Sequence, residues 1–215
     1  MVMKESGEAP FHLSLTLEPE WIGEFNPFLQ QGFQVAVRVG CSVRELLCDQ
    51  LGIDREYVFG RITTVFQDNK AIDDLNAAIV RNGSRITLSA TLPGLVGATM
   101  RRGGFYAAMR DTITHRETGE KALHGGGVVR MKLFNLLLPE LGPSFLQRGI
   151  GLTAAELADF LARRPAIFWQ GCRKILLNGA PLEPERLKAG EALPGEGTVW
   201  LAVSFGKEDE KNDVG

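Results

Sequence analysis

The sequence predicts an α+β protein made of two similar small domains in tandem, each a mixed sheet with one main helix. Three observations carry this prediction: an internal repeat, a matched pair of helix-start signals, and matched strand-turn-strand segments. The 215 residues are 44% hydrophobic and 23% charged, which is typical of a soluble globular chain and excludes a largely disordered one.

The repeat appears when Phe11–Gly32 is written above Val128–Gly149, at a constant offset of 117 residues. Phe28-Leu29-Gln30 then falls on Phe145-Leu146-Gln147, and in both copies a glycine follows two residues later. Identity is low, but both copies have an apolar strand, a loop and an FLQxG segment in the same order. Such self-similarity indicates a duplicated structural unit.

Each copy then has a helix-start signal of the capping-box type. The first runs from Ser42 to Glu45 and the second from Thr153 to Glu156. In this motif the hydroxyl accepts from the amide three residues later, and the glutamate returns to the first amide. Behind each box, apolar residues recur at helical spacing and predict one buried face: Val43, Leu46, Leu47 and Leu51 in the first copy, and Ala154, Leu157, Ala158 and Leu161 in the second.

Each copy continues with a strand, a tight turn and a final alternating strand. The turns are expected at Asp68-Asn69-Lys70-Ala71 and at Asn178-Gly179-Ala180-Pro181, and the Asn-Gly pair of the second readily takes positive φ, a strong reverse-turn signal. The final strands are expected at 85–88 and 198–203. A helix packed on one sheet face lets the apolar stripe and that face bury each other.

We therefore predict a first domain at 1–94, a glycine-rich basic connector at 95–127, a second domain at 128–206 and a charged tail at 207–215. In the connector, Phe105, Ala108, Met109 and Ile113 are spaced for a short amphipathic helix. These apolar residues either pack on one of the two sheets or belong to a docking surface for a partner. One continuous α+β domain with coincidental symmetry is the alternative.

The element order resembles the β-grasp, or ubiquitin-like, fold. It is most similar to the small sulfur-carrier proteins of molybdopterin and thiamine synthesis, through SVRELLCDQLGI, VFQDNKAIDD and VRNGSRITLSATLPG in the first copy. In the second copy, TAAELADFLARR, ILLNGAPLE and PGEGTVWLAVSF carry the same resemblance. Those carriers act through a C-terminal Gly-Gly, whereas this chain ends in Val214-Gly215 and lacks that terminus.

A Gly-Gly does occur inside the connector, in Met100-Arg101-Arg102-Gly103-Gly104. It supports three interpretations: a hinge between domains, a partner- or anion-binding site, or a carrier terminus exposed by proteolysis after Gly104. Seven basic and three acidic residues between Leu95 and Lys132 give this stretch a charge of +4 in a protein of net charge -2. Basic side chains beside glycine amides suit an anion, so Arg101, Arg102, Gly103 and Gly104 are the candidate binding residues.

The sequence offers no catalytic signature, no metal site and no cofactor motif. GxGxxG, GxxxxGK[ST] and HExxH are all missing, and the connector histidines His115 and His124 have no second ligand at metal spacing. Arg173 and Lys174 stand next to Cys172 and could lower its thiol pKa, but an inert cysteine is the default. The three cysteines cannot all pair, and the N-terminus lacks the apolar core of a signal peptide, so we expect a cytoplasmic protein.

These observations predict a protein that is not an enzyme and acts as a protein-binding module. Its net charge of -2 gives no general attraction to nucleic acid or membrane. The resemblance implies a partner from sulfur transfer or metal-cofactor assembly, either an adenylating activating enzyme or a molybdenum or tungsten cofactor enzyme. The alternative is a sulfur or protein carrier that is activated at Gly104 after proteolytic processing.

Overall fold

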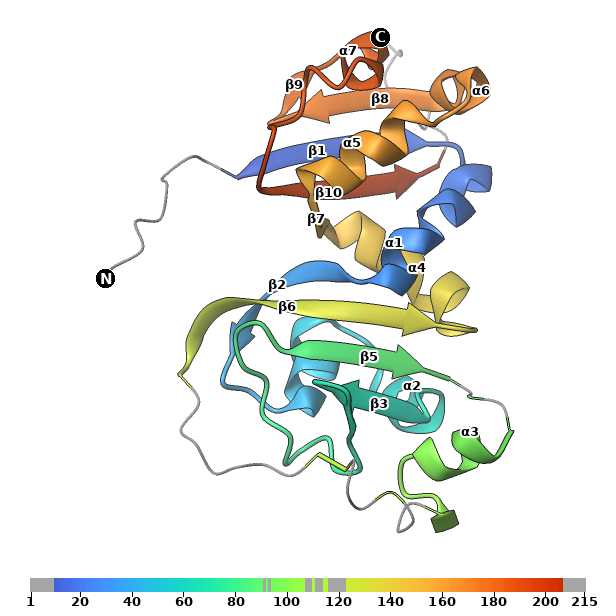
Figure 1. Cartoon of the computed structure of the whole chain (residues 1–215), viewed down its shortest axis with the longest axis vertical. Coiled ribbons are helices and arrows are strands. Elements are labelled where there is room, and N and C mark those ends of the chain that lie inside the picture. The colour runs from blue at the N-terminus through green and yellow to red at the C-terminus, as the bar shows by residue number, and fades with distance from the viewer. Residues whose placement is uncertain are drawn as a thin grey trace, which may run out of the picture. The chain divides into compact units, whose positions relative to one another are not determined.

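The computed structural model describes residues 10–90, 92, 94–106, 110, 114–115 and 123–206 (Figure 1). It is an α+β protein with mixed parallel and antiparallel strand pairing, as predicted. The chain divides into two compact units. Phe25–Pro143 forms one, here called the central unit, and Met1–Glu24 with Ser144–Gly215 forms the other, here called the terminal unit.

The central unit has five strands in the order β4-β3-β5-β6-β2. β5 and β6 are parallel, and the other neighbours are antiparallel. Its elements are α1 (Asn26–Gln31), β2 (Phe33–Val39), η2 (Glu45–Gln50), α2 (Arg55–Gly60), β3 (Thr64–Gln67), β4 (Lys70–Ala71), β5 (Arg85–Ser89), α3 (Gly94–Met100) and β6 (Gly125–Phe134). α4 (Leu137–Arg148) begins in this unit.

The terminal unit also has five strands, in the order β7-β10-β1-β8-β9. β1 and β10 are parallel, and the other neighbours are antiparallel. Its elements are β1 (Phe11–Leu17), η1 (Pro19–Phe25, whose last residue falls in the central unit), β7 (Ile150–Thr153), α5 (Ala154–Ala162), α6 (Ala166–Gln170), β8 (Cys172–Leu177), β9 (Ala180–Pro181), α7 (Pro184–Lys188) and β10 (Thr198–Phe205).

Two strands lie outside the domains that the sequence predicts for them. β1 pairs over seven residues with β10 and also pairs with β8, both from the predicted 128–206 domain. β6 lies between β5 and β2, both from the predicted 1–94 domain. Each unit therefore contains one strand from the other half of the sequence. Both strands alternate buried and half-buried residues over most of their length, and such a pattern selects a face but not a neighbour.

The local signals of the repeat are present at corresponding positions. Gly32 and Gly149 both have positive φ, 115° and 100°. Their amides donate to the carbonyls of Phe28 and Phe145, at 3.0 and 3.1 Å. Asn178 and Gly179 have the positive φ expected of the Asn-Gly turn, and Asp68 and Asn69 have positive φ at the corresponding turn of the first copy. These glycines and turns are set by neighbours within a few residues.

Both predicted capping boxes are confirmed. The Ser42 amide donates to Glu45 Oε2 at 2.7 Å, and the Glu45 amide donates back to Ser42 Oγ at 3.2 Å. Thr153 and Glu156 make the same reciprocal pair at the start of α5. The helix behind the first box differs from the expected α-helix, because η2 has the wider turn of a π-helix. Its stripe is nevertheless buried, with Leu46 and Leu47 fully covered.

The predicted connector helix cannot be assessed, because Ala108, Met109 and Ile113 lie outside the described residues, as does the charged tail at 207–215. Of the two alternatives for Phe105, packing on a sheet is excluded, because its side chain is 92% exposed. The described helices are all too short or too polar to cross a lipid bilayer.

Candidate functional site

The predicted binding segment Arg101–Gly104 follows α3 and is held in the central unit by backbone hydrogen bonds. The Arg102 amide donates to the Thr63 carbonyl at 2.8 Å, and the Gly104 amide donates to the Arg101 carbonyl at 3.1 Å. Gly103 has a φ of 62°, a conformation that glycine adopts without steric cost. The double glycine therefore forms a tight turn anchored beside the start of β3.

Arg102 is largely occupied inside the protein. Its Nη2 donates to the carbonyls of Val58 and Phe59, at 3.1 and 3.2 Å. These carbonyls belong to the last turn of α2, where a cation also complements the helix dipole. The guanidinium stacks over the Phe59 ring at 5.2 Å, and burial lowers the pKa of Arg102. Because Nη1 is buried as well, this side chain anchors the connector to α2 and has little capacity left for an external anion.

Asp73 also anchors the Arg101–Gly104 segment. Its Oδ1 accepts from the Gly103 amide at 3.2 Å and from Arg110 Nη2 at 2.5 Å. Arg110 is only 3% exposed and also donates to the Thr99 carbonyl at 2.7 Å and to Thr114 Oγ1 at 2.9 Å. The described part of the connector is therefore packed onto the central unit by paired, partly buried polar groups.

Of the four predicted binding residues, Arg101 is the one whose side chain faces solvent. It borders a hollow of about 140 Å³ whose other walls include Thr63 and Leu92. Arg101, Gly103 and Gly104 do lie together, but Arg102 turns inward to α2. The side chains of these two adjacent residues therefore point in different directions, that of Arg101 to solvent and that of Arg102 to α2.

The same segment carries apolar side chains that the sequence did not single out as a site. Phe105 is 92% exposed and meets Tyr106 edge to face, with ring centroids 5.2 Å apart. Phe59, at the end of α2, is 44% exposed and lies between the guanidinium groups of Arg55 and Arg102. We call Phe59, Phe105 and Tyr106, with Arg55, Arg101 and Arg102, the Phe105 surface. The aromatic pair directly after MRRGG was the available sequence signal.

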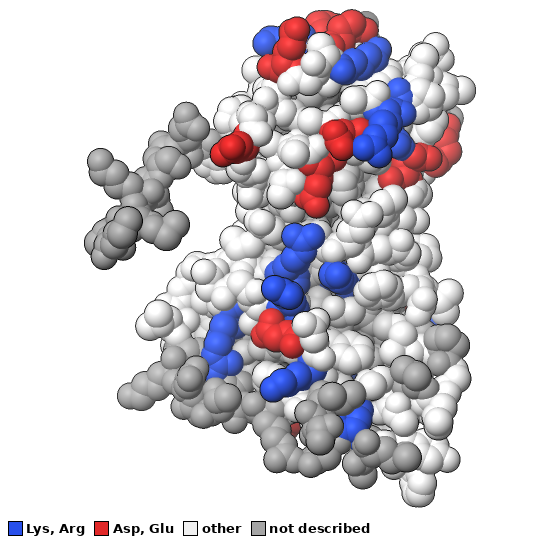
Figure 2. Space-filling model, in the orientation of Figure 1, with Lys and Arg blue, Asp and Glu red and all other residues white. Residues whose placement is uncertain are grey.

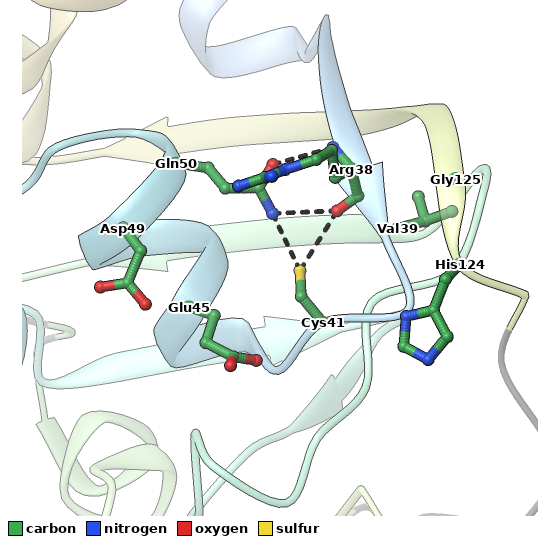
Figure 3. A pocket seen from close by; sticks show the side chains of 8 residues that line it. All are labelled: Arg38, Val39, Cys41, Glu45, Asp49, Gln50, His124 and Gly125. Atoms are coloured by element: carbon green, nitrogen blue, oxygen red, sulfur yellow. Dashed lines mark hydrogen bonds between the residues drawn. The ribbon is translucent and has the colours of Figure 1, made fainter.

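A pocket of about 300 Å³ lies beside the end of β2 (Figure 3). The Gln50 side chain makes two hydrogen bonds with the backbone of Arg38: it accepts from the amide at 2.8 Å and donates to the carbonyl at 2.9 Å. Cys41 Sγ donates to the same carbonyl at 3.2 Å and accepts from Gln50 Nε2 at 3.1 Å. The lining residues are Arg38, Val39, Cys41, Glu45, Asp49, Gln50, His124 and Gly125.

This pocket does not assemble a nucleophile with a base. Burial raises the pKa of the Cys41 thiol, so the thiol stays protonated at neutral pH, and only the thiolate is a strong nucleophile. Figure 3 shows the Cys41 sulfur pointing toward Gln50 and away from the His124 ring. That ring packs against Gly40, where an added Cβ would come within 2.5 Å of Nδ1. Within the described ranges, no three potential metal ligands form a cluster.

Cys172, in the terminal unit, is also inactive as a nucleophile. Burial raises its thiol pKa to about 11, so the neighbouring cations Arg173 and Lys174 do not lower it. Arg173 instead pairs with Glu18 at 2.8 Å. The sequence placed two cations beside this thiol, but strand neighbours point to opposite faces.

Among the described acids, Glu140 in α4 has the most strongly perturbed pKa. Arg61 donates to both of its carboxylate oxygens, and the Tyr57 hydroxyl donates to Oε2. The Arg61 hydrogen bonds and then the Tyr57 hydrogen bond lower the pKa of Glu140 to about 2, while burial and Glu140 raise the pKa of Tyr57. A carboxylate that is ionised at neutral pH and a protonated phenol form a cross-link between α2 and α4, and neither group is poised to exchange a proton near neutral pH.

Comparisons with known proteins give no family for this chain: no protein-family model, no curated protein and no solved structure matches it.

Proposed function

We propose that the protein is a non-catalytic protein-binding module that docks a partner through the Phe105 surface. The observation that carries the proposal is the 92% exposure of Phe105, whose ring meets that of Tyr106. Arg102, in the same segment, stacks on the exposed ring of Phe59. Single exposed apolar residues are common, but clustered large ones mark interaction sites. Of the seven large apolar side chains exposed on described residues, three are in this surface and a fourth, Leu95, is in α3 just before it.

The chemistry of the surface suits a protein partner. Aromatic residues and arginine are the side chains most enriched at the centres of interfaces, because they bury much area and keep few freely rotating bonds. Phe59 is held between two guanidinium groups, at 5.6 and 5.2 Å, so little side-chain entropy remains to be lost there on binding. The partner that fits has an apolar pocket for Phe105 and carboxylates around its rim for Arg55 and Arg101.

The reactive groups of the described chain favour binding over catalysis. The thiols of Cys41 and Cys172 are kept protonated by burial, and the carboxylate of Glu140 is kept ionised by Arg61. A catalytic acid or base works best with a pKa close to the operating pH. The pKa values of these three groups are all shifted away from it.

We further propose that the partner belongs to sulfur transfer or metal-cofactor assembly, as the β-grasp resemblance implies. The central unit supports this kinship in part. In this unit β6 is antiparallel to β2 on one side and parallel to β5 on the other, and β5 is antiparallel to β3. This is the arrangement expected of a β-grasp domain, with β6 in the place of the first strand.

The alternative, a carrier released at Gly104, has less support from the strand pairings. Cleavage after Gly104 separates the first half of the chain from β6, which lies between β5 and β2. It also leaves β1 without its neighbours β8 and β10. A released fragment would thus lose strands that both units require. The amide of Gly104 and the guanidinium of Arg102 are, in addition, already engaged.

The test compares Phe105→Glu with Leu123→Glu, a matched control at a residue that is 88% exposed and outside the Phe105 surface. Each variant and the wild type are used to capture proteins from lysate of the native cell, with quantitative mass spectrometry. We expect proteins recovered by the wild type and by Leu123→Glu to fall about tenfold or more with Phe105→Glu, the loss expected when one interface anchor is removed. Equal recovery with all three baits would refute the proposal.

A further inference from the structure

A second surface of the central unit carries cations that no described acid neutralises. Arg130 of β6 stands directly beside Arg85 of β5 and Gln34 of β2 in the strand register. Lys132 lies two residues along β6, beside Thr87. Figure 2 shows Lys and Arg side chains gathered over these strands on the face turned to the viewer.

These side chains share the sheet face opposite the apolar core. Met131 and Leu133 alternate with them along β6 and are fully buried, as is Ile86 beside Arg85. Successive side chains of a strand point to opposite faces, so Arg85, Arg130 and Lys132 point away from that core. We call this surface the Arg130 face.

Arg85 and Arg130 bring two positive charges to neighbouring positions of parallel strands. Among the described residues, neither guanidinium pairs with a carboxylate. Asp68 lies close, but its Oδ1 accepts from the Arg85 backbone amide at 2.9 Å. Arg130 Nη2 reaches only the Gln31 carbonyl, at 3.5 Å, which is too long for a strong bond.

Gly32 leaves space for the side chains of Arg130 and Lys132. A Cβ added at Gly32 would come within 2.7 Å of Arg130 Nε and 3.2 Å of Lys132 Cε. Both side chains therefore lie across the glycine, where a larger residue would displace them. Gly32 also has positive φ, so a glycine at this position both forms the turn and leaves space for the side chains of Arg130 and Lys132.

Apolar rings flank the charges. Phe66 of β3 is the neighbour of Thr87, which is in turn the neighbour of Lys132. Phe134 lies two residues beyond Lys132 on β6, and both phenylalanines are half-buried. The face thus presents two guanidinium groups and one ammonium group, bordered by aromatic surface.

We propose that the Arg130 face binds an extended acidic segment of a protein partner. Its carboxylates would be held by Arg85, Arg130 and Lys132, and an apolar side chain between them would pack on Phe66 or Phe134. Arginine recognises carboxylates bidentately. A nucleic acid is the weaker fit, because nucleic-acid-binding domains are usually strongly basic and this protein has a net charge of -2. The face is separate from the Phe105 surface and adds a second contact to the proposed module.

The test measures fluorescence anisotropy of a labelled glutamate-rich peptide that also carries leucines, titrated with the full chain. Arg130→Glu is compared with Arg163→Glu, which makes the same charge change at an exposed site in the terminal unit. We expect Arg130→Glu to weaken binding about tenfold or more and Arg163→Glu less than about twofold. Equal weakening by the two variants would mean that net charge alone attracts the peptide, and would overturn the proposal.

Three more measurements distinguish this ligand and this face from competing ones. Oligo-dT of the same length should bind more weakly than the peptide at the same salt concentration; tighter binding would assign the face to nucleic acid instead. Phe105→Glu should leave the affinity for the peptide unchanged. Loss of peptide binding therefore tests the Arg130 face alone, and loss of partner capture by Phe105→Glu tests the proposed function alone. Arg130→Thr should lose peptide binding without lowering the melting temperature, because threonine suits a strand and the hydrogen bond that Arg130 makes to the Gln31 carbonyl is only a weak one of 3.5 Å. No binding by the wild type would refute the proposal.

Discussion

At the scale of single residues, the two adjacent arginines of MRRGG have opposite roles. Arg101 faces solvent, whereas Arg102 donates to the Val58 and Phe59 carbonyls and stacks on the Phe59 ring. Removing a group that satisfies partly buried carbonyls leaves them without a partner, which costs more than the hydrogen bond itself contributes. The Arg102 side chain should therefore matter for stability, and the Arg101 side chain for contacts with other molecules.

We predict that Arg102→Ala lowers the free energy of unfolding by about 1–3 kcal/mol, the range for losing a partner of buried polar groups. Arg101→Ala, one residue away, should change it by less than about 0.5 kcal/mol, as is usual for exposed positions. Chemical denaturation monitored by tryptophan fluorescence measures both. Equal losses for the two variants would contradict the assigned roles.

At the scale of elements, Glu140 joins two helices of the central unit. Its carboxylate accepts from Tyr57 in α2 and from Arg61, the residue that ends α2. The folded state holds the pKa of Glu140 at about 2, below its ordinary value of 4.5. An acid whose pKa falls on folding stabilises the protein above its unfolded pKa, and that stabilisation is lost as the pH drops through the folded pKa.

The melting temperature of Glu140→Gln should therefore lie below that of the wild type at neutral pH. The difference should shrink as the pH falls from about 4.5 and disappear below about pH 2, where Glu140 is protonated in both states. Glu56→Gln, on the exposed side of α2, is the control. A wild-type advantage that persists unchanged down to pH 2 would show that the α2–α4 link does not depend on this charge.

At the scale of the whole molecule, the exchange of β1 and β6 makes each unit depend on both halves of the chain. β1 contributes to the terminal unit alongside β10 and β8, and β6 contributes to the central unit between β5 and β2. If the chain were cut between β5 and β6, the two fragments would stay associated, because β1 pairs with β8 and β10 and because β6 pairs with β2 and β5. Either piece alone would lack a strand of one unit and expose the edges of that sheet.

We predict that a specific protease site inserted between His115 and Leu123, once cleaved, yields two fragments that coelute in native size-exclusion chromatography and separate in denaturant. The isolated fragment that ends at Gly104 should show no cooperative unfolding, because it lacks β6, β8 and β10. Cooperative unfolding of that fragment would instead support a self-contained first domain and reopen the carrier alternative.

The candidate sites could be predicted from the sequence only in part. Arg101–Gly104 could be selected, because a basic Gly-Gly segment is visible in the sequence. The inward turn of Arg102 was not predictable, since it depends on carbonyls of α2 more than forty residues earlier. For Cys172 the default of an inert cysteine agrees with its raised pKa, because burial outweighs the charges of its neighbours in sequence.

The sequence by itself determined the local structure: both capping boxes, the positive-φ turn residues and the buried stripe of η2, because each depends on residues within a few positions of one another. Only the tertiary structure decided the partners of β1 and β6. Strands with the same alternation of apolar and polar residues can pair in several orders, and the order that buries the most surface depends on the whole chain. That choice also places Arg85 beside Arg130, and so creates the Arg130 face.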